Sequence, residues 1–479
     1  MRQVTVLPAA VCEKIPLPDR EIVEKRLHET QAQFKRKIVV LDDDPTGVQT
    51  VHDVPVYTDW RRQTLERVLL EPCRMVFVLT NSRSFTEAAT RQVHREIAQN
   101  LAAASQTTGV PFLLVNRGDS TLRGHYPLET QILRQELEKH MAVQYSGEVI
   151  MPYFQEGGRV TVDNVHYVKN EERLIPVGMT EFAKDTTFSF SASDLTEWCE
   201  ERSGGAYPAE DAVVISLTDL RNLDYAGILK KLMGVRHFRK VIVNAADDRD
   251  AEVFATALLQ AIQQGREFLF YSAAGLVRVL GGISKRPLLT RDELCPAGNS
   301  LGGLVIVGSH VQKTTEQLEY LLSSGLNTVP ICFHAEAVLQ PAALQEEHDR
   351  VLRETETAIR SGQTAVVYTS RRVLRAQEES TQENLRLSVQ ISRALTSAVG
   401  NLTVRPSFLV AKGGITSNDI GVRALGVRRA WVMGQAAPGV PVWRTGKESK
   451  FPNLAYVIFP GNVGGKTTLS SVVQMLAGE

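Results

Sequence analysis

The chain has 479 residues, of which 43% are apolar and 23% are charged, as in an ordinary globular protein. This length exceeds what one hydrophobic core normally holds, so we expect two domains. Lysine plus arginine equals aspartate plus glutamate at 54 each, and this zero net charge argues against nucleic acid or an anionic membrane as the partner.

The cysteines and the N-terminal residues indicate the compartment. Five cysteines are scattered singly, which suits a reducing environment and disfavours a zinc cluster or a disulfide framework. Residues 1–26 contain no long apolar stretch of the kind found in a secretory signal. No apolar run approaches the roughly 18 residues that a membrane helix needs. The sequence therefore predicts a cytoplasmic protein.

Short apolar runs alternate with longer amphipathic segments along the chain, the pattern of parallel strands joined by helices. Strands are expected first at residues 38–41, 76–79, 112–115, 149–151, 213–217 and 241–243. A second series follows at residues 304–307, 365–368, 408–411, 430–433 and 456–459. Helical periodicity is clearest over residues 251–264, 314–322 and 385–398. The predicted fold is α/β, with two domains that are each a mostly parallel sheet flanked by helices.

The two series of strands are separated by residues 284–303, which contain Pro287, Pro296 and the pair Gly302-Gly303. Turn-forming residues without helical or strand periodicity are typical of a linker. We therefore expect an N-terminal domain over residues 1–290 and a C-terminal domain over residues 300–479.

Polar loops follow four of the expected strands in the N-terminal half, at residues 42–47, 80–84, 116–125 and 156–159. In open α/β sheets, ligands bind beyond the carboxyl ends of the strands, where such loops converge. Guanidinium groups bind carboxylates in bidentate fashion, and carboxylates accept hydrogen bonds from hydroxyls. The loops therefore predict a pocket for a polyhydroxylated anion, although single members can instead pair with one another or cap helices. The candidates are Asp43, Asp44, Arg83, Arg117, Asp119, Arg123 and Arg159.

Glycine-bearing loops follow three expected strands in the C-terminal half, at residues 308–310, 412–419 and 460–467. Glycine lets backbone N–H groups approach an anion closely, and a helix N-terminus adds a favourable dipole. Together the loops predict a cradle for nucleotide phosphates; taken singly, each also fits a tight turn between packed elements.

The last of these loops resembles a Walker A motif in its Gly461 and Gly465-Lys466. That motif has four residues between the first glycine and the Gly-Lys pair, and here there are three. About a dozen residues follow Thr467, too few for another strand with a metal-binding aspartate. The sequence therefore does not predict a P-loop.

Two other classes of protein remain open from the residues alone. The run from Val39 to Gly47 also fits the nucleophile loop of haloacid-dehalogenase-like phosphatases, with Asp42 as nucleophile, Asp44 as acid/base and Mg²⁺ between them. In that interpretation, Asp247-Asp248 would correspond to the family's distal metal-binding acidic pair. A non-catalytic protein that binds sugar acids is the third possibility. Neither alternative uses the glycine loops of the C-terminal half for catalysis.

The motifs, taken in order over roughly residues 36–470, resemble the four-carbon acid sugar kinase family. The matching runs are Asp43-Asp44-Pro45-Thr46-Gly47, Asn81-Ser82-Arg83, Asp119-Ser120-Thr121-Leu122-Arg123-Gly124, Glu156-Gly157-Gly158-Arg159 and Thr180-Glu181-Phe182-Ala183-Lys184-Asp185. They continue with Gly308-Ser309, Thr314, Gln317, Lys412-Gly413-Gly414-Ile415-Thr416 and Pro460-Gly461-Asn462-Val463-Gly464. The resemblance implies an N-terminal domain that binds an acid such as threonate, erythronate or a 3-oxo-tetronate. It also implies a C-terminal domain that binds ATP, with phosphorylation of the acid's terminal hydroxyl in the cleft between domains.

Site roles follow from the resemblance, with Asp43 or Asp44 as the base for the attacking hydroxyl and Mg²⁺ on the phosphates. Arg83 and Arg123 would hold the carboxylate, and Asp119 the hydroxyls. The remaining substrate positions are Thr46, Gly47, Asn81, Ser82, Ser120, Gly158 and Arg159. The nucleotide positions are Gly308, Ser309, Lys412, Gly413, Gly414, Ile415, Thr416, Gly461, Asn462 and Gly464. The partners expected are the sugar acid, ATP and a second copy of the chain in a homodimer.

This chain departs from the usual family pattern at a few positions. Pro45 and the pair Val48-Gln49 alter the aspartate loop, Val311 stands where the first nucleotide loop often has serine, and Ser272-Ala273 replaces a common Arg-Thr. The resemblance therefore leaves the identity of the acid open.

Overall fold

The computed structural model describes residues 3–295, 298, 300–309, 311–370 and 381–479, and divides the chain into two compact units. The first unit comprises Met1–Gly47 and Asp59–Ser284, and the second comprises Val48–Thr58 and Lys285–Glu479. No feature of the sequence predicts that residues 48–58 belong to the second unit. This assignment means that the aspartate loop of the first unit runs directly into a strand of the second.

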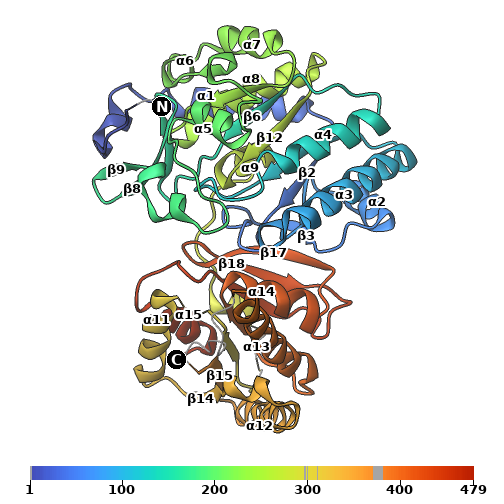
Figure 1. Ribbon diagram of the computed structural model, residues 1–479, viewed down its shortest axis with the longest axis vertical. Helices are drawn as coiled ribbons and strands as arrows, with labels where there is room; N and C mark the ends of the chain where they lie inside the picture. Colours follow the sequence, from blue (N-terminus) through green and yellow to red (C-terminus); the bar gives the residue numbers. More distant parts are fainter. Residues whose placement is uncertain (1–2, 296–297, 299, 310, 371–380) are drawn as a thin grey trace. The chain divides into compact units, whose positions relative to one another are not determined.

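The first unit is built on seven parallel strands in the order β10-β11-β6-β12-β5-β2-β4 (Figure 1). Their apolar runs are buried almost throughout, as expected for a parallel sheet covered on both faces. The strands are β2 (Lys37–Asp42), β4 (Met75–Leu79), β5 (Phe112–Arg117), β6 (Gly147–Met151), β10 (Val213–Ile215), β11 (Arg239–Val243) and β12 (Phe268–Ser272).

Helices pack around this sheet in two groups (Figure 1). One group comprises α2 (Arg62–Leu70), α3 (Glu87–Thr108) and α4 (Leu128–His140). The other comprises α1 (Arg20–Gln33), α6 (Leu217–Arg221), α7 (Tyr225–Gly234), α8 (Asp248–Gln263) and α9 (Ala274–Gly281). Helix α5 (Leu195–Arg202) packs on β11. Local sequence fixes the ends: Thr86 caps α3 at its start and Gly109, in the left-handed region, ends it. The strand expected to reach residue 217 stops at Ile215 because Ser216 and Asp219 form a capping box that starts α6.

A small antiparallel sheet lies beside the parallel one in the first unit. Its order is β1 (Leu7–Pro8), β9 (Arg173–Pro176), β8 (Val165–Asn170) and β7 (Arg159–Val162). β7 begins at Arg159, so this sheet fixes the backbone of one candidate arginine.

The second unit contains five parallel strands extended by an antiparallel edge, in the order β3-β17-β18-β19-β16-β13-β15-β14. The strands are β3 (Val54–Tyr57), β13 (Leu304–Val307), β14 (Thr328–Phe333), β15 (Thr364–Thr369), β16 (Leu409–Lys412), β17 (Arg429–Ala437), β18 (Val440–Thr445) and β19 (Ala455–Phe459). The helices are α10 (Arg291–Leu294), α11 (Gln312–Ser323), α12 (Pro341–Arg360), α13 (Thr381–Asn401), α14 (Gly414–Asp419) and α15 (Thr468–Ala477). Each unit is thus a mostly parallel sheet flanked by helices, which confirms the predicted α/β class.

The segment expected to be a linker is partly packed. Thr290 and Glu293 form a capping box that starts α10, and Leu289 and Leu294 are buried in the core of the second unit. Only its beginning therefore serves as a connection between the units.

Strand order defines one switch point in each unit. From β2 the chain passes through β3 to β4 on one side and then to β5 on the other, so the strand order reverses between β2 and β5. In the second unit the chain runs from β13 to β14 and β15 on one side and then to β16 on the other. Ligands in open α/β sheets bind at such points, and the two candidate sites follow these four strands.

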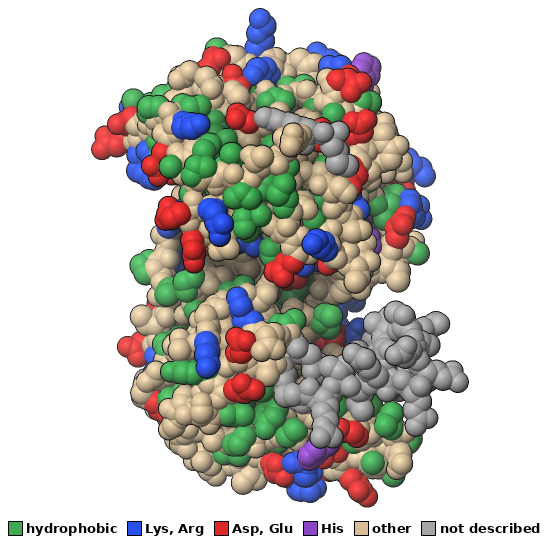
Figure 2. Space-filling model, turned by 60° about the vertical axis from the view of Figure 1, so that its left-hand side comes forward, with side chains coloured by type: hydrophobic (Ala, Val, Ile, Leu, Met, Phe, Trp, Pro, Cys, Tyr) green, Lys and Arg blue, Asp and Glu red, His purple; other side chains and the backbone are tan. Residues whose placement is uncertain are grey.

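The surface agrees with a small-molecule partner. Acidic and basic side chains are interspersed over the face seen in Figure 2, in keeping with their equal totals. Within the described part of the chain, no helix is long and apolar enough to span a bilayer.

Candidate functional site

Arg83 is the centre of a charge network beyond β2 and β5. Its Nε lies 2.9 Å from Asp43 Oδ2, and its terminal nitrogens lie 3.5 Å from Asp44 Oδ2 and 3.9 Å from Asp119 Oδ1. Burial would lower the pKa of Arg83, but these three carboxylates raise it well above its ordinary value. Arg83 is therefore a fixed cation that holds the carboxylates in place.

Asp42, the last residue of β2, is shut away from any ligand. Its side chain is 1% exposed, and a Cβ added at Gly47 would lie 2.0 Å from Asp42 Oδ1, so the backbone of Gly47 covers the carboxylate. Arg117 Nη1 lies 3.5 Å from the same oxygen. Burial raises the pKa of Asp42 to about 7, although Arg117 opposes the shift.

Asp43 and Asp44 differ in how many of their carboxylate oxygens accept close hydrogen bonds from the protein. Asp43 accepts from Arg83 with both oxygens and is buried, and burial raises its pKa to about 6. Asp44 uses Oδ1 to accept from the Thr46 N–H at 2.8 Å and from the Thr46 hydroxyl at 2.5 Å. Among the described residues, its Oδ2 has only the long contact to Arg83, and its side chain is 20% exposed. Asp44 therefore keeps an oxygen available to a ligand.

Asp119 links this network to Arg123. Its Oδ2 accepts from Arg123 Nε at 2.7 Å and from the Thr121 hydroxyl. Burial would raise the pKa of Asp119, but Arg83 and Arg123 outweigh burial and hold the pKa below its usual range.

Arg159 is a half-buried cation without a salt-bridge partner among the described residues. Its Nε is shielded from solvent and meets no acceptor there. Burial lowers the pKa of Arg159; the carboxylate of Asp119 opposes this shift, and the nearby Arg123 adds to it. The Phe182 ring lies 5.1 Å from the Arg123 guanidinium and 5.6 Å from that of Arg159. Two guanidiniums over one ring, one of them unpaired, make a place for an anion.

Several other residues support the loops from behind. Ser82 is fully buried and donates to Glu129 at 2.6 Å, and Asn116 donates to the other Glu129 oxygen at 3.0 Å. His166 is buried and lies 2.8 Å from the Ser120 carbonyl oxygen; burial lowers its pKa to about 4. Asn81 has φ +55 and donates to Ser84, while Gly158 has φ +72 in the turn before β7. Ser82, Asn81, Ser120 and Gly158 thus shape the loops.

In the second unit the structure brings the three glycine loops together. A Cβ added at Gly308 would lie 2.3 Å from Thr416 Oγ1, and one at Gly413 would lie 3.1 Å from Ser309 Cβ. A Cβ at Gly461 would lie 3.1 Å from Ser309 Oγ. The loops after β13, β16 and β19 therefore pack so closely that glycine is needed for their backbones to meet. Residue 310 lies outside the described residues.

The nucleotide positions differ in exposure. Ile415 is 65% exposed at the start of α14, whereas Lys412 is fully buried. The Lys412 ammonium donates to the carbonyl oxygens of Pro460 at 2.6 Å and Gly461 at 3.3 Å. Lys412 therefore faces the inside of the last loop.

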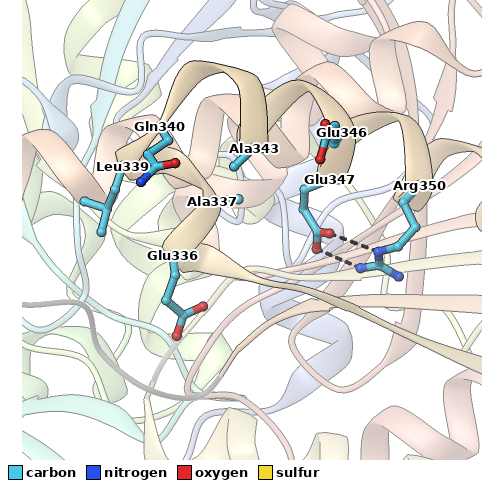
Figure 3. Close-up of a pocket in the computed structure, with 8 residues that line it drawn as sticks. All are labelled: Glu336, Ala337, Leu339, Gln340, Ala343, Glu346, Glu347 and Arg350. Atoms are coloured by element: carbon cyan, nitrogen blue, oxygen red, sulfur yellow. Dashed lines mark hydrogen bonds and ion pairs between the residues drawn. The ribbon is translucent and has the colours of Figure 1, made fainter.

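A separate pocket of about 620 Å³ lies between the 3₁₀ turn Ala335–Leu339 and α12 (Figure 3). Its lining includes Glu336, Glu346 and Glu347, and Glu347 is paired with Arg350 at 2.7 Å. This acidic lining does not suit phosphates. Across the described ranges, no group of three or more His, Cys, Asp or Glu is placed to hold a metal ion.

The sequence predicted the loops that lie together in each unit, and it did not mark some of the residues that hold these loops. Glu129, His166 and Tyr271 stand outside the loops, and no motif marks them. Tyr271, whose hydroxyl donates to the Asp119 carbonyl at 3.3 Å, lies on β12, a strand absent from the predicted series. Phe182 had a signal, since it lies within a family motif, but no role was predicted for it.

Comparisons with known proteins agree with this division. A sugar-binding N-terminal domain model matches residues 38–280, and a nucleotide-binding C-terminal domain model matches residues 304–469. The class of protein is therefore a two-domain α/β protein that combines sugar binding with nucleotide binding. The chain belongs to the four-carbon acid sugar kinase family, also known as DUF1537.

Solved structures share the fold at low sequence identity. A protein from Salmonella typhimurium LT2, which carries a provisional tRNA-synthase label, is 16% identical with a TM-score of 0.62; the match covers 91% of this chain and 98% of that one. A Haemophilus influenzae protein of DUF1537 is 16% identical with a TM-score of 0.60, covering 91% of this chain and 100% of that one. No curated protein sequence matches the chain.

Proposed function

We propose that this protein is an ATP-dependent kinase that phosphorylates a hydroxyl of a small sugar acid of the four-carbon type. The observation that carries the proposal is Arg159, a half-buried arginine without a paired carboxylate, beside Arg123 and over the ring of Phe182. A buried cation of this kind is stabilised by an anionic ligand, and a guanidinium fits a carboxylate bidentately.

The ion pairs of Arg83 favour a different choice of arginines for the acid's carboxylate. Arg83, expected to share this task with Arg123, is already engaged by Asp43, Asp44 and Asp119. We therefore assign the acid's carboxylate to Arg159 and Arg123, and its hydroxyls to Asp119 and Thr46.

Asp44 is the better candidate for the base that accepts the proton of the attacking hydroxyl. Its Oδ2 is not used by a close hydrogen bond, whereas both oxygens of Asp43 are bound by Arg83. Phosphoryl transfer depends mainly on alignment and charge stabilisation, so Asp43 contributes by fixing Arg83 and the loop. Mg²⁺ would arrive with ATP and be held mostly by phosphate oxygens and water.

The phosphatase alternative fits the geometry poorly. Its nucleophile would be Asp42, which is covered by Gly47 and lies against Arg117. A nucleophile must be open to an incoming phosphorus atom, and this carboxylate is not.

A ligand screen tests the proposal. Thermal shifts are measured with C4 to C6 sugar acids and with the corresponding alditols, each with and without ADP. We expect shifts with acids but not with alditols, because only the acids carry the group that Arg159 and Arg123 bind. Equal shifts with an acid and its alditol would contradict the carboxylate assignment, and the absence of any shift with ADP would contradict the nucleotide assignment.

A further inference from the structure

The loop after β19 has one edge bound by side chains from beneath. Lys412 donates to the carbonyls of Pro460 and Gly461, and Thr314 Oγ1 donates to that of Gly461 at 2.9 Å. Gln317 Nε2 donates to the carbonyls of Val463 at 3.0 Å and Gly465 at 2.8 Å. The carbonyl edge of residues 460–465 is thus held by β16 and α11.

The three donors are internal residues. Lys412, Thr314 and Gln317 are each 0% exposed, so they contact the loop from its protein side. Lys313, by contrast, is exposed and reaches only the Asn462 carbonyl, at 3.3 Å.

The N–H groups of the same loop are less used than its carbonyls. Within the described part of the chain, the N–H groups of Gly461, Asn462 and Gly464 donate no hydrogen bond to protein; Gly461 and Asn462 form a turn that brings the Val463 N–H towards the Pro460 carbonyl, and the Gly465 N–H donates to Thr468 at 2.9 Å. Gly464 adopts φ +83, and alternation of backbone hand lets successive N–H groups converge on an anion. Turning the carbonyls inward is what leaves these amides available.

Lys412 adds positive charge beneath the same loop. Its ammonium faces the two carbonyls and the Phe459 ring at 4.0 Å, and its charged neighbour is Lys313 on α11; no carboxylate among the described residues contacts it. Burial, with a contribution from Lys313, lowers the pKa of Lys412 to about 7. An anion at the amide edge would offset this repulsion.

We propose that Gln317, Thr314 and Lys412 are positioning residues that hold the carbonyl edge of residues 460–465 so that its amides bind the nucleotide phosphates. Lys412 then acts through the loop and not as a direct phosphate ligand. This inference rests on the proposed use of ATP by the second unit.

Calorimetric titration of the full chain with ADP tests the positioning role. We expect Gln317→Leu, which removes two hydrogen bonds to the loop, to weaken ADP binding at least tenfold while leaving sugar-acid binding within twofold. Lys466→Met removes an exposed lysine from the same loop and serves as the matched control, with ADP affinity expected within twofold of wild type. A P-loop would give the opposite order.

Proton linkage adds a measurement that does not depend on a variant folding. Burial lowers the pKa of Lys412 to about 7, and a bound polyphosphate should raise it again, so we expect ADP binding near pH 8 to take up protons. Titrations in two buffers of different ionisation enthalpy measure this uptake, which Gln317→Leu should keep and Lys412→Met should lose.

The outcomes separate this inference from the proposed function. Wild-type affinity for ADP in Gln317→Leu would overturn the positioning role while leaving the kinase proposal intact. Failure of the wild-type chain to bind any adenine nucleotide would overturn both.

Discussion

The two units place their candidate sites at the same topological position and build them from different chemistry. Beyond β2 and β5, the candidate ligand-binding groups are charged side chains: Arg83 holds three carboxylates, and Arg159 has no carboxylate paired with it among the described residues. Beyond β13, β16 and β19, the groups that we propose for nucleotide binding are backbone amides of glycine loops, and the buried Lys412 lies behind them.

This difference bears on how each proposed site would distinguish one ligand from another. A site made of side chains distinguishes ligands by charge and shape, because each guanidinium or carboxylate needs a matching group. A site made of backbone amides binds any phosphate that reaches it, and its specificity must come from elsewhere in the second unit. Variation in the acid substrate should therefore follow changes in the first unit.

The largest effect should follow from removing the unpaired cation of the first unit. We expect Arg159→Met to weaken sugar-acid binding by at least hundredfold, within the range of about 2–5 kcal/mol for a buried charged hydrogen-bonded pair. Arg159→Lys keeps the charge without the fork and should recover part of the loss. Calorimetry measures both, with ADP affinity as the control. Unchanged acid binding in Arg159→Met would contradict the assignment of the acid's carboxylate to Arg159.

A smaller effect, on nucleotide binding and not on acid binding, is expected at the glycine loops of the second unit. Gly413 has φ +120, and a Cβ there would lie 3.1 Å from Ser309 Cβ, so Gly413→Ala should weaken ADP binding more than tenfold and leave acid binding alone. Gly426→Ala is the matched control, because Gly426 also has a positive φ, +64, but a Cβ there meets nothing within 4 Å. If both variants lose ADP equally, general backbone strain and not the loop contact is responsible.

A third effect concerns the pH dependence of the stability of the first unit. Burial raises the pKa of Asp42 to about 7, so the folded chain keeps a proton that the unfolded chain releases above about pH 4. The contribution of Asp42 to stability therefore falls as pH rises from about 4 to 7. Relative to wild type, Asp42→Asn should gain about 1–3 kcal/mol between pH 5 and pH 8. Hydrogen exchange of β2 amides measures the change; a relative loss of stability over that interval would contradict the buried, unused carboxylate.

Much of the parallel framework was predictable from sequence, because buried strands followed by polar loops leave a local pattern. β2 with its aspartate loop and β16 with Lys412-Gly413 are examples. β12 was missed because Phe268–Ser272 runs without a polar break into the apolar helix α9, so no periodicity marks the boundary. β3 was missed because it is short, contains Pro55 and pairs with β17, far away in the chain.

The partners within each site were less predictable than the loops that form it. The sequence predicted four arginines for the acid pocket, but ion pairing depends on three-dimensional distances, and only the structure shows that Arg83 is engaged and Arg159 is not. The family resemblance placed Lys412 among the nucleotide positions. Its side chain turns inward because Lys412 is the last residue of a strand buried on both faces.

We propose that an acid bound by the first unit accepts the terminal phosphate of a nucleotide bound by the second. Turnover is measured by phosphorus NMR with ATP, Mg²⁺ and each C4 to C6 sugar acid in turn, for wild type and Asp44→Asn. We expect one sugar-acid phosphate to form for each ADP, only when acid and ATP are both present, with a severe loss of rate in Asp44→Asn. Inorganic phosphate released from a sugar-acid phosphate without nucleotide, or no ADP formed with any acid that binds, would contradict the account.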